Sequence, residues 1–199
     1  MPEKRRIIIG VDESGRGPLA GPVVAGAVFI DGFFDIREQL NYFKIPDCKK
    51  LSFKKREEVF SFIQSHPKIH WAVGRAGERI IDRINILEAT KLAMQRAVAN
   101  LEKKLPESAD LLLIDGNFGL DLPYQQQSII KGDENVFLIT LASIIAKVKR
   151  DRLMLNYHKR YPQYGFDSHK GYGTKKHYQA LGRGGPCSLH RRTFRLLQK

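Results

Sequence analysis

Four acidic side chains follow short apolar stretches of the sequence, at positions where β-strands are expected to end. They are, in chain order, Asp12, Glu13, Asp115 and Asp133. Strands of one sheet end near one another in space, so these carboxylates are expected to converge at one rim of a sheet. Converging carboxylates repel one another unless a cation lies between them, and Mg²⁺ or Mn²⁺ is the usual partner of such oxygen ligands. The pattern therefore predicts a site for divalent metal ions.

The chemistry that such a site supports is hydrolysis of a phosphodiester. Two ions about 4 Å apart can activate a water on one side of the phosphorus and stabilise the leaving oxygen on the other. Neighbouring residues of a regular strand point to opposite faces, so Asp12 is the safer ligand of the adjacent pair. Glu13 is expected to join the site only if the strand has ended, as Ser14 and Gly15 allow, or through its main-chain carbonyl.

Each acid taken singly also has a structural interpretation. Asp12 can cap a turn, Asp115 can be a turn residue, and Asp133 can cap the helix that follows it. Asp151 has an arginine on either side and is interpreted as a member of an ion pair on a helix surface. Only the set of acids, and no single member, favours a metal site.

A glycine-rich turn, Gly15-Arg16-Gly17, follows the first two acids directly. Pro18 and the later spacing do not fit a dinucleotide-binding GxGxxG motif. The glycines allow backbone N–H groups to approach a sugar or phosphate closely, and Arg16 adds a charged fork. The alternative is a tight hairpin connection without a ligand.

Three further places combine positive charge with a feature that suits phosphates or bases. Lys49 and Lys50 precede an expected helix N-terminus, where phosphate binding and a solvated charge pair are equal alternatives. Tyr172 lies among glycines and cations in the stretch 169–174 and is a candidate stacking platform for a sugar or base. Arg191 lies between His190 and Arg192 and adds a candidate phosphate contact.

The charge balance favours a polyanionic partner. Lys and Arg number 34 against 21 Asp and Glu, which gives a net charge of +13. Residues 150–199 hold 12 of the cations and two of the acids, so this stretch contributes 12 − 2 = +10. Such asymmetry is typical of nucleic-acid binding, although a basic surface that keeps the protein in solution is the simpler alternative.

The cysteines and apolar stretches indicate the compartment. Cys48 and Cys187 match no zinc-binding spacing and are expected to be free thiols in a reducing compartment. The N-terminal apolar run ends too early for a signal peptide, and the apolar stretch 136–146 is too short to span a bilayer. A cytoplasmic protein without membrane segments is expected.

Hydrophobic periodicity predicts an α/β fold, in which helices pack on a mixed β-sheet. We expect one domain over residues 1–199, in which residues from about 150 onward form a basic, helical C-terminal region. Strands are expected at 6–11, 23–30, 69–73, 110–114 and 127–130, and helices at 52–65, 85–105, 136–159 and 174–181. The strand at 69–73 alternates in polarity, which predicts that one of its faces is buried.

Taken together, these motifs resemble the ribonuclease HII family over nearly the whole chain. The resemblance is carried by the stretches 11–23, 47–52, 81–82, 85–87, 114–117, 131–133, 142–152 and 169–174. It implies an RNase H-like fold, a mixed five-stranded sheet flanked by helices. It also assigns the metal-binding catalytic set, which consists of Asp12, Glu13, Asp115 and Asp133 with two Mg²⁺ or Mn²⁺ ions.

The resemblance also implies a substrate. In this family the turn that corresponds to Gly15-Arg16-Gly17 reads a ribose 2′-hydroxyl, which is the group that distinguishes RNA from DNA, and the tyrosine at position 172 stacks on the adjoining deoxyribose. The implied enzyme is a monomeric endoribonuclease. It hydrolyses the RNA strand of RNA/DNA hybrids and cuts on the 5′ side of ribonucleotides embedded in duplex DNA, leaving 3′-hydroxyl and 5′-phosphate ends.

Two positions depart from the family pattern. Cys48 stands where the family usually has serine, which bears on one phosphate contact, and Leu141 stands where alanine is common. Two other classes of function remain open from the residues alone. One is a non-catalytic nucleic-acid-binding protein, which explains the charge but not the acids; the other is a metal-dependent phosphotransferase for small phosphate esters.

Overall fold

The computed structural model describes residues 6–32 and 51–196, so Cys48, Lys49 and Lys50 lie outside the described residues. The elements are β1 (Ile8–Ser14), β2 (Val23–Ile30), α2 (Phe53–Ser65), β3 (Ile69–Ala76), α3 (Glu78–Glu102), β4 (Leu111–Asp115), β5 (Gln125–Ile129), α4 (Gly132–Asn135), α5 (Phe137–Arg160), a 3-10 turn (Pro162–Tyr164), α6 (Phe166–His169) and α7 (Lys175–Gly184). None of the helices in these ranges is long and apolar enough to cross a membrane.

The sheet has five strands in the order β3-β2-β1-β4-β5. β1 and β2 are antiparallel, as are β2 and β3, whereas β1, β4 and β5 run parallel to one another. Because β1 is central and β4 is its parallel neighbour, both strands reach the same rim of the sheet. The predicted fold class, a mixed five-stranded sheet flanked by helices, is confirmed.

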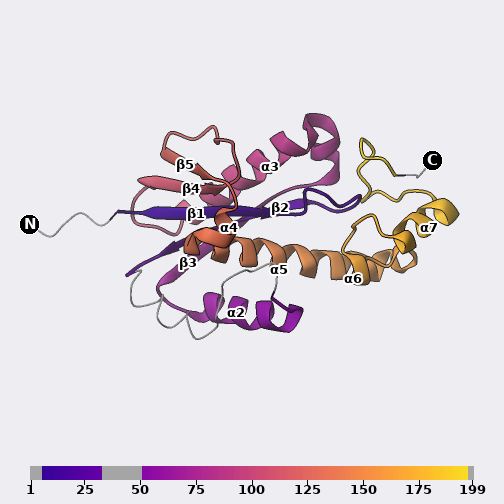
Figure 1. The fold of residues 1–199 in the computed structure, drawn as a ribbon, viewed down its shortest axis with the longest axis horizontal. Coiled ribbons are helices and arrows are strands. Elements are labelled where there is room, and N and C mark those ends of the chain that lie inside the picture. The colour runs from indigo at the N-terminus through magenta and orange to yellow at the C-terminus, as the bar shows by residue number, and fades with distance from the viewer. Residues whose placement is uncertain (1–5, 33–50, 197–199) are drawn as a thin grey trace, which may run out of the picture.

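Helices cover both faces of the sheet (Figure 1). α3 packs on one face, where Val11, Ile114 and Met94 belong to one buried apolar cluster. α2 and α5 pack on the other face in a second cluster that includes Phe60 and Ile144. The prediction that one face of β3 is buried is confirmed for the face of Ala72 and Ala76, whereas Trp71 and Val73 on the other face are only partly buried.

Two element boundaries differ from the prediction for reasons that lie in tertiary structure. β1 does not end at Val11; its pairing with β2 continues through Asp12 and Glu13 to Ser14. The long helix α3 begins at Glu78 rather than at Asn85, whose backbone angles (φ 65°, ψ 170°) interrupt the helix. The Asn85 carboxamide oxygen accepts hydrogen bonds from the next turn, so this residue caps the second half of α3.

Glycines allow α5 to lie unusually close to the strands that carry the acids. A Cβ atom on Gly10 would lie 2.5 Å from the main chain of Leu138. A Cβ on Gly26 would overlap the carbonyl oxygen of Ala142 in the same helix. Gly26 is also the β2 residue paired with Asp12. The absence of a side chain at Gly26 therefore sets how closely α5 approaches Asp12.

We expect Gly26→Ala to destabilise the protein by about 1–3 kcal/mol, the usual cost of forcing extra volume into a packed interior. The added methyl group must displace the backbone of α5, because the atom that it meets is a main-chain oxygen. Chemical denaturation measures the loss. Gly182→Ala is the control, because nothing lies within 4 Å of a Cβ there; equal stability of the two variants would contradict the close packing of α5.

Candidate active site

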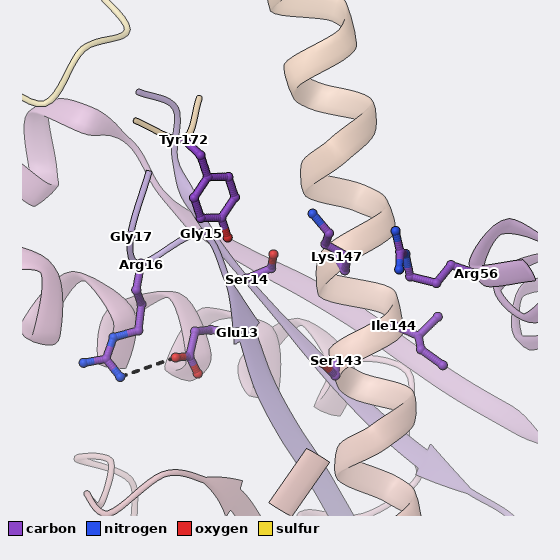
Figure 2. Close-up of a pocket in the computed structure, with 10 residues that line it drawn as sticks. All are labelled: Glu13, Ser14, Gly15, Arg16, Gly17, Arg56, Ser143, Ile144, Lys147 and Tyr172. Atoms are coloured by element: carbon purple, nitrogen blue, oxygen red, sulfur yellow. Dashed lines mark hydrogen bonds and ion pairs between the residues drawn. The ribbon is translucent and has the colours of Figure 1, made fainter. Parts of the chain in front are cut away.

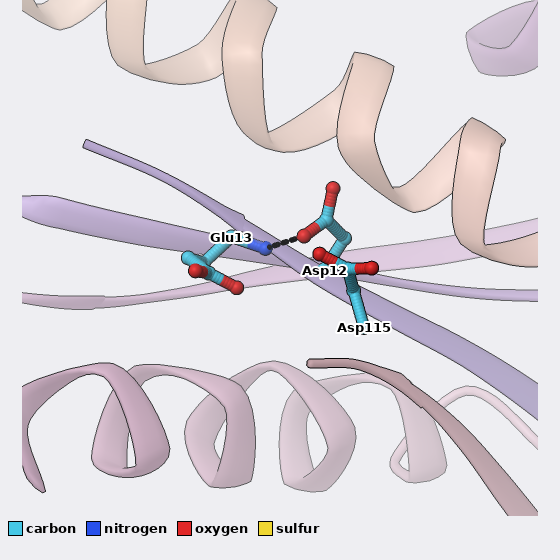
Figure 3. A group of neighbouring side chains, drawn as sticks. All are labelled: Asp12, Glu13 and Asp115. Atoms are coloured by element: carbon cyan, nitrogen blue, oxygen red, sulfur yellow. Dashed lines mark hydrogen bonds between the residues drawn. The ribbon is translucent and has the colours of Figure 1, made fainter. Parts of the chain in front are cut away.

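Three of the four predicted acids lie together at the rim of the sheet (Figure 3). Asp12, Glu13 and Asp115 each offer one carboxylate oxygen, and these atoms all lie within 4.8 Å of one another. Asp12 and Asp115 meet because they follow Val11 and Ile114, which are register partners in the parallel β1–β4 pair. The expectation that Glu13 requires the strand to end before it is wrong, since β1 continues to Ser14 and the Glu13 carboxylate still reaches the group.

The three carboxylates are held in an unfavourable electrostatic setting. Asp12 is only 4% exposed. Burial raises its pKa well above the usual 3.8, and the charges of Glu13 and Asp115 raise it further. Hydrogen bonds from the Ser143 side chain and the Glu13 backbone N–H lower this pKa again, the latter at 2.6 Å.

Glu13 is held in a similar way. Burial raises its pKa, against the opposing effect of Arg16, whose guanidinium lies 3.5 Å from the Glu13 carboxylate. Buried carboxylates that repel one another and offer several oxygen atoms are the donor set that hard divalent cations prefer. The residues present therefore fit a metal ion of the Mg²⁺ or Mn²⁺ type.

Asp133, the fourth predicted acid, is not a member of this close group. It is 1% exposed and lies in the short helix α4. The residue before it, Gly132, donates its N–H to Asp115 Oδ1 at 2.7 Å. Thr140 of α5 donates to the Asp133 carbonyl at 2.8 Å. The segment that carries Asp133 is therefore attached to the acidic group by a hydrogen bond. The Asp133 carboxylate itself does not belong to the group whose oxygen atoms all lie within 4.8 Å of one another.

A cavity of about 370 Å³ opens beside Glu13 (Figure 2). Its lining consists of Glu13, Ser14, Gly15, Arg16, Gly17, Arg56, Ser143, Ile144, Lys147 and Tyr172. The glycine-rich turn and Tyr172 are in contact range, because a Cβ on Gly17 would lie 3.7 Å from the tyrosine ring. Tyr172 is 43% exposed. Four of the predicted substrate-binding residues thus share one cavity with a predicted metal ligand.

Two cations in this lining were not among the predicted site residues. Arg56 lies in the first turns of α2, and Lys147 lies in the middle of α5. Lys147 also forms an ion pair with Asp151 at 2.9 Å. The interpretation of Asp151 as an ion-pair residue is confirmed, but its predicted place on the surface is wrong, since Asp151 is 3% exposed. The spacing of four residues between a lysine and an aspartate was the available signal.

Arg191 has a different role from the predicted one. Its side chain is 0% exposed, so the predicted direct contact with a phosphate is wrong. The guanidinium donates to the carbonyl oxygens of Gly15 at 2.6 Å, Arg16 at 2.7 Å and Gly21 at 2.7 Å. Arg191 therefore fixes the backbone of the glycine-rich turn from the buried side of that turn.

Arg150 supports the same segment from α5 and was not predicted at all. It is also 0% exposed, and its guanidinium donates to the carbonyl oxygens of Ala20 at 3.2 Å and Pro22 at 3.0 Å. A third bond, to the Lys170 carbonyl at 3.0 Å, ties in the loop that carries Tyr172. Buried arginines with planar, multiple donors suit this kind of backbone clamp.

The fold is shared with solved nuclease structures. The PCNA:RNase HII complex from Archaeoglobus fulgidus matches with a TM-score of 0.77 and 23% identity over 97% of each chain. Bst-RNase HIII in complex with Mn²⁺ matches with a TM-score of 0.75 and 16% identity, over 96% of this chain and 68% of that one. The mixed sheet and the acidic group at its rim define an RNase H-like fold whose carboxylates can hold a metal ion.

Sequence comparison places the chain within that class. The family model described as Ribonuclease HII matches residues 9–197. The Ribonuclease HII of Coxiella burnetii (strain Dugway 5J108-111) is 50% identical over 188 residues, which are 94% of this chain and 88% of that protein. The chain belongs to the ribonuclease HII family, and the predicted resemblance is confirmed.

Proposed function

We propose that this enzyme hydrolyses the RNA strand of RNA/DNA hybrids and cuts duplex DNA on the 5′ side of an embedded ribonucleotide, leaving 3′-hydroxyl and 5′-phosphate ends. The observation that carries the proposal is the shared cavity. Glu13 of the acidic group and the turn Gly15-Arg16-Gly17 line the same space, together with Tyr172. A group that recognises a ribose is thereby held beside the carboxylates that would bind metal.

Asp12, Glu13 and Asp115 would hold the metal, with Asp133 as the proposed fourth member of the catalytic set. Divalent ions bound there would lower the pKa of a water molecule and stabilise the charge that develops on the leaving oxygen. Mg²⁺ or Mn²⁺ in a two-ion arrangement is the proposed cofactor. The repulsion among the buried carboxylates supports it, as does the structural neighbour Bst-RNase HIII, which was solved with Mn²⁺.

The residues around the acids bind and orient the substrate in this proposal. The backbone N–H groups of the glycine-rich turn and the Arg16 guanidinium contact the ribose and its phosphate. Tyr172 stacks against the next sugar, which is a deoxyribose at an RNA–DNA junction. Arg56 and Lys147 add positive charge within the same cavity, where a phosphodiester backbone needs it.

Lys49 and Lys50 are proposed phosphate contacts. We take residues 1–199 to act as one catalytic unit and as a monomer. The proposed compartment is the cytoplasm, where the proposed enzyme would meet a duplex substrate.

A duplex with one ribonucleotide embedded in DNA is the decisive substrate. We expect one incision on its 5′ side in the presence of Mg²⁺ or Mn²⁺, and none when a chelator removes the ions. The product ends are read by ligation and by extension of the 3′-hydroxyl. The same duplex without the ribonucleotide is the control. Efficient cutting of long hybrids without incision at the single ribonucleotide would contradict the proposed specificity.

A further inference from the structure

A second groove lies over the outer edge of strand β3, and we call it the edge groove. It has a volume of about 610 Å³, compared with about 370 Å³ for the cavity beside the acids, and the two share no lining residue. Its polar lining consists of Arg75, Arg96, Asn100, Lys149, Arg152 and Asn156. Within the described ranges its lining thus has four cations and no acidic side chain.

Side chains of α3 and of the turn that follows it cover the backbone carbonyls along this edge. The bonds run from Arg96 to the Arg75 carbonyl at 2.7 Å, from Asn100 to the Val73 carbonyl at 3.0 Å and from Lys104 to the Trp71 carbonyl at 2.8 Å. The donor residues follow one another at a spacing of four, which is about 6 Å along a helix. The accepting carbonyls follow at a spacing of two residues, which is about 6.6 Å along a strand, so each donor lies opposite one carbonyl. Gly74 allows the close contact, because a Cβ there would overlap the backbone of α3.

This arrangement leaves the edge with donors only. In an antiparallel strand the N–H and C=O of one residue point in the same direction, so the N–H groups of Val73 and Arg75 also face outward. No other described residue accepts a hydrogen bond from these two N–H groups. A peptide that adds a strand needs free carbonyls as well as N–H groups, and the carbonyls are already occupied. The edge groove therefore suits a ligand that consists of acceptors.

The cations of the edge groove are held close together. Lys149 lies 4.9 Å from the centre of the Trp71 ring, and burial, Arg152 and Lys104 all lower its pKa. Arg152 has an acidic partner, Glu57, at 2.5 Å. Arg75 and Lys149 form no ion pair with any other residue that the structure describes. An anionic ligand would relieve this repulsion.

We propose that the edge groove binds the phosphodiester backbone of nucleic acid, as a second contact separate from the cavity beside the acids. Outward N–H groups, guanidinium forks and an ammonium are all donors, and phosphate oxygens are acceptors with the opposite charge. The ligand is either an extension of the duplex that reaches the acidic site or a second nucleic-acid segment. The inference concerns binding only and does not depend on where the enzyme cuts.

Arg75→Ala tests the edge groove, since Arg75 is exposed and its side chain makes no hydrogen bond to a described residue. Lys103→Ala is the matched control: it removes one positive charge from an exposed residue that lines neither cavity. The probe is an all-DNA duplex that is not cut, with binding measured over a range of salt concentrations. Arg75→Ala is expected to weaken binding several-fold at low salt and to reduce the slope of log K against log salt by about one.

Duplex length separates the two sources of the ligand. If the groove holds the far part of the same duplex, Arg75→Ala weakens binding of a long duplex but not of one that fills only the acidic site. If it holds a second segment, the variant removes a second binding step even with the short duplex. Lys103→Ala is expected to change neither result, and circular dichroism confirms that both variants are folded.

The proposal is overturned if Arg75→Ala and Lys103→Ala give the same affinity and the same salt slope. It is also overturned if Arg75→Ala leaves duplex binding unchanged but abolishes binding of an oligoglutamate peptide, because the groove would then serve an acidic protein. Cleavage at an embedded ribonucleotide is measured separately, so a failure of the proposed function and a failure of the edge groove give different results.

Discussion

Replacing Asp12 with asparagine is expected to reduce cleavage by more than about a thousandfold, which corresponds to roughly 4 kcal/mol of transition-state stabilisation. The same substitution is expected to make the metal-free protein more stable at neutral pH. Both effects have one cause. Asp12 is buried against two other carboxylates, and the charge that suits a metal ion opposes folding when no ion is bound.

The sign of the stability effect follows from the raised pKa. A carboxyl group whose pKa is higher in the folded protein than in the unfolded chain binds its proton more tightly in the fold. The stability contributed by Asp12 is therefore full below its usual pKa of 3.8 and is lost as the pH rises through the raised value. Asparagine keeps the shape without the charge. At neutral pH and without metal ions the variant should therefore be more stable than the unmodified protein, because the unfavourable charge is absent.

Denaturation with and without divalent ions measures this prediction. Mg²⁺ or Mn²⁺ should stabilise the unmodified protein by binding the folded state, and should stabilise Asp12→Asn much less. Asp121→Asn is the control, because Asp121 is exposed and lies outside the acidic group. If Asp12→Asn retained ion-dependent cleavage, the carboxylates would have to be assigned another role and a non-catalytic binding protein would become the better interpretation.

The sequence predicted the acidic group because its signals are local. Apolar runs that end in Asp12 and Asp115 are visible without knowing the fold, and parallel strands bring their ends to one rim. The predicted helix start at Asn85 is partly right for the same reason. Its side chain is a good helix cap, and it does cap a helical segment, but the preceding turns of α3 have no comparable start signal in the sequence.

The parts that could not be predicted depend on contacts between distant residues. The continuation of β1 through Glu13 depends on pairing with β2, and a pattern of apolar residues cannot reveal such pairing. The burial of Arg191 depends on the return of the C-terminal region to Gly15, a separation of 176 residues along the chain. A basic stretch at the end of a basic protein is normally expected on the surface, and that expectation led to the wrong role.

Arg191→Met provides the strongest test of the corrected role. Methionine fills a similar space without donors, so the carbonyls of Gly15, Arg16 and Gly21 lose their partner. Each buried carbonyl left without a hydrogen bond costs about 1–3 kcal/mol. Removing the guanidinium offsets part of this loss, because its charge is unfavourable in the fold: burial and the charge of Arg150 lower the pKa of Arg191 to about 9. We expect a net loss of about 2–4 kcal/mol in the free energy of unfolding.

Arg192→Met separates positioning from direct phosphate binding. Arg192 is the exposed neighbour of Arg191, and its removal takes away the same charge. If Arg191 positions the glycine-rich turn, Arg191→Met lowers kcat on a duplex with one embedded ribonucleotide and lowers stability, whereas metal binding at Asp12 persists. Arg192→Met then changes neither kcat nor stability by much. If instead both variants lost the same activity, and a lower salt concentration restored that activity in both, Arg191 would act through its charge on the substrate. The glycine-rich turn, which is proposed to bind the ribose, is thus expected to depend on a buried side chain that makes no contact with the substrate.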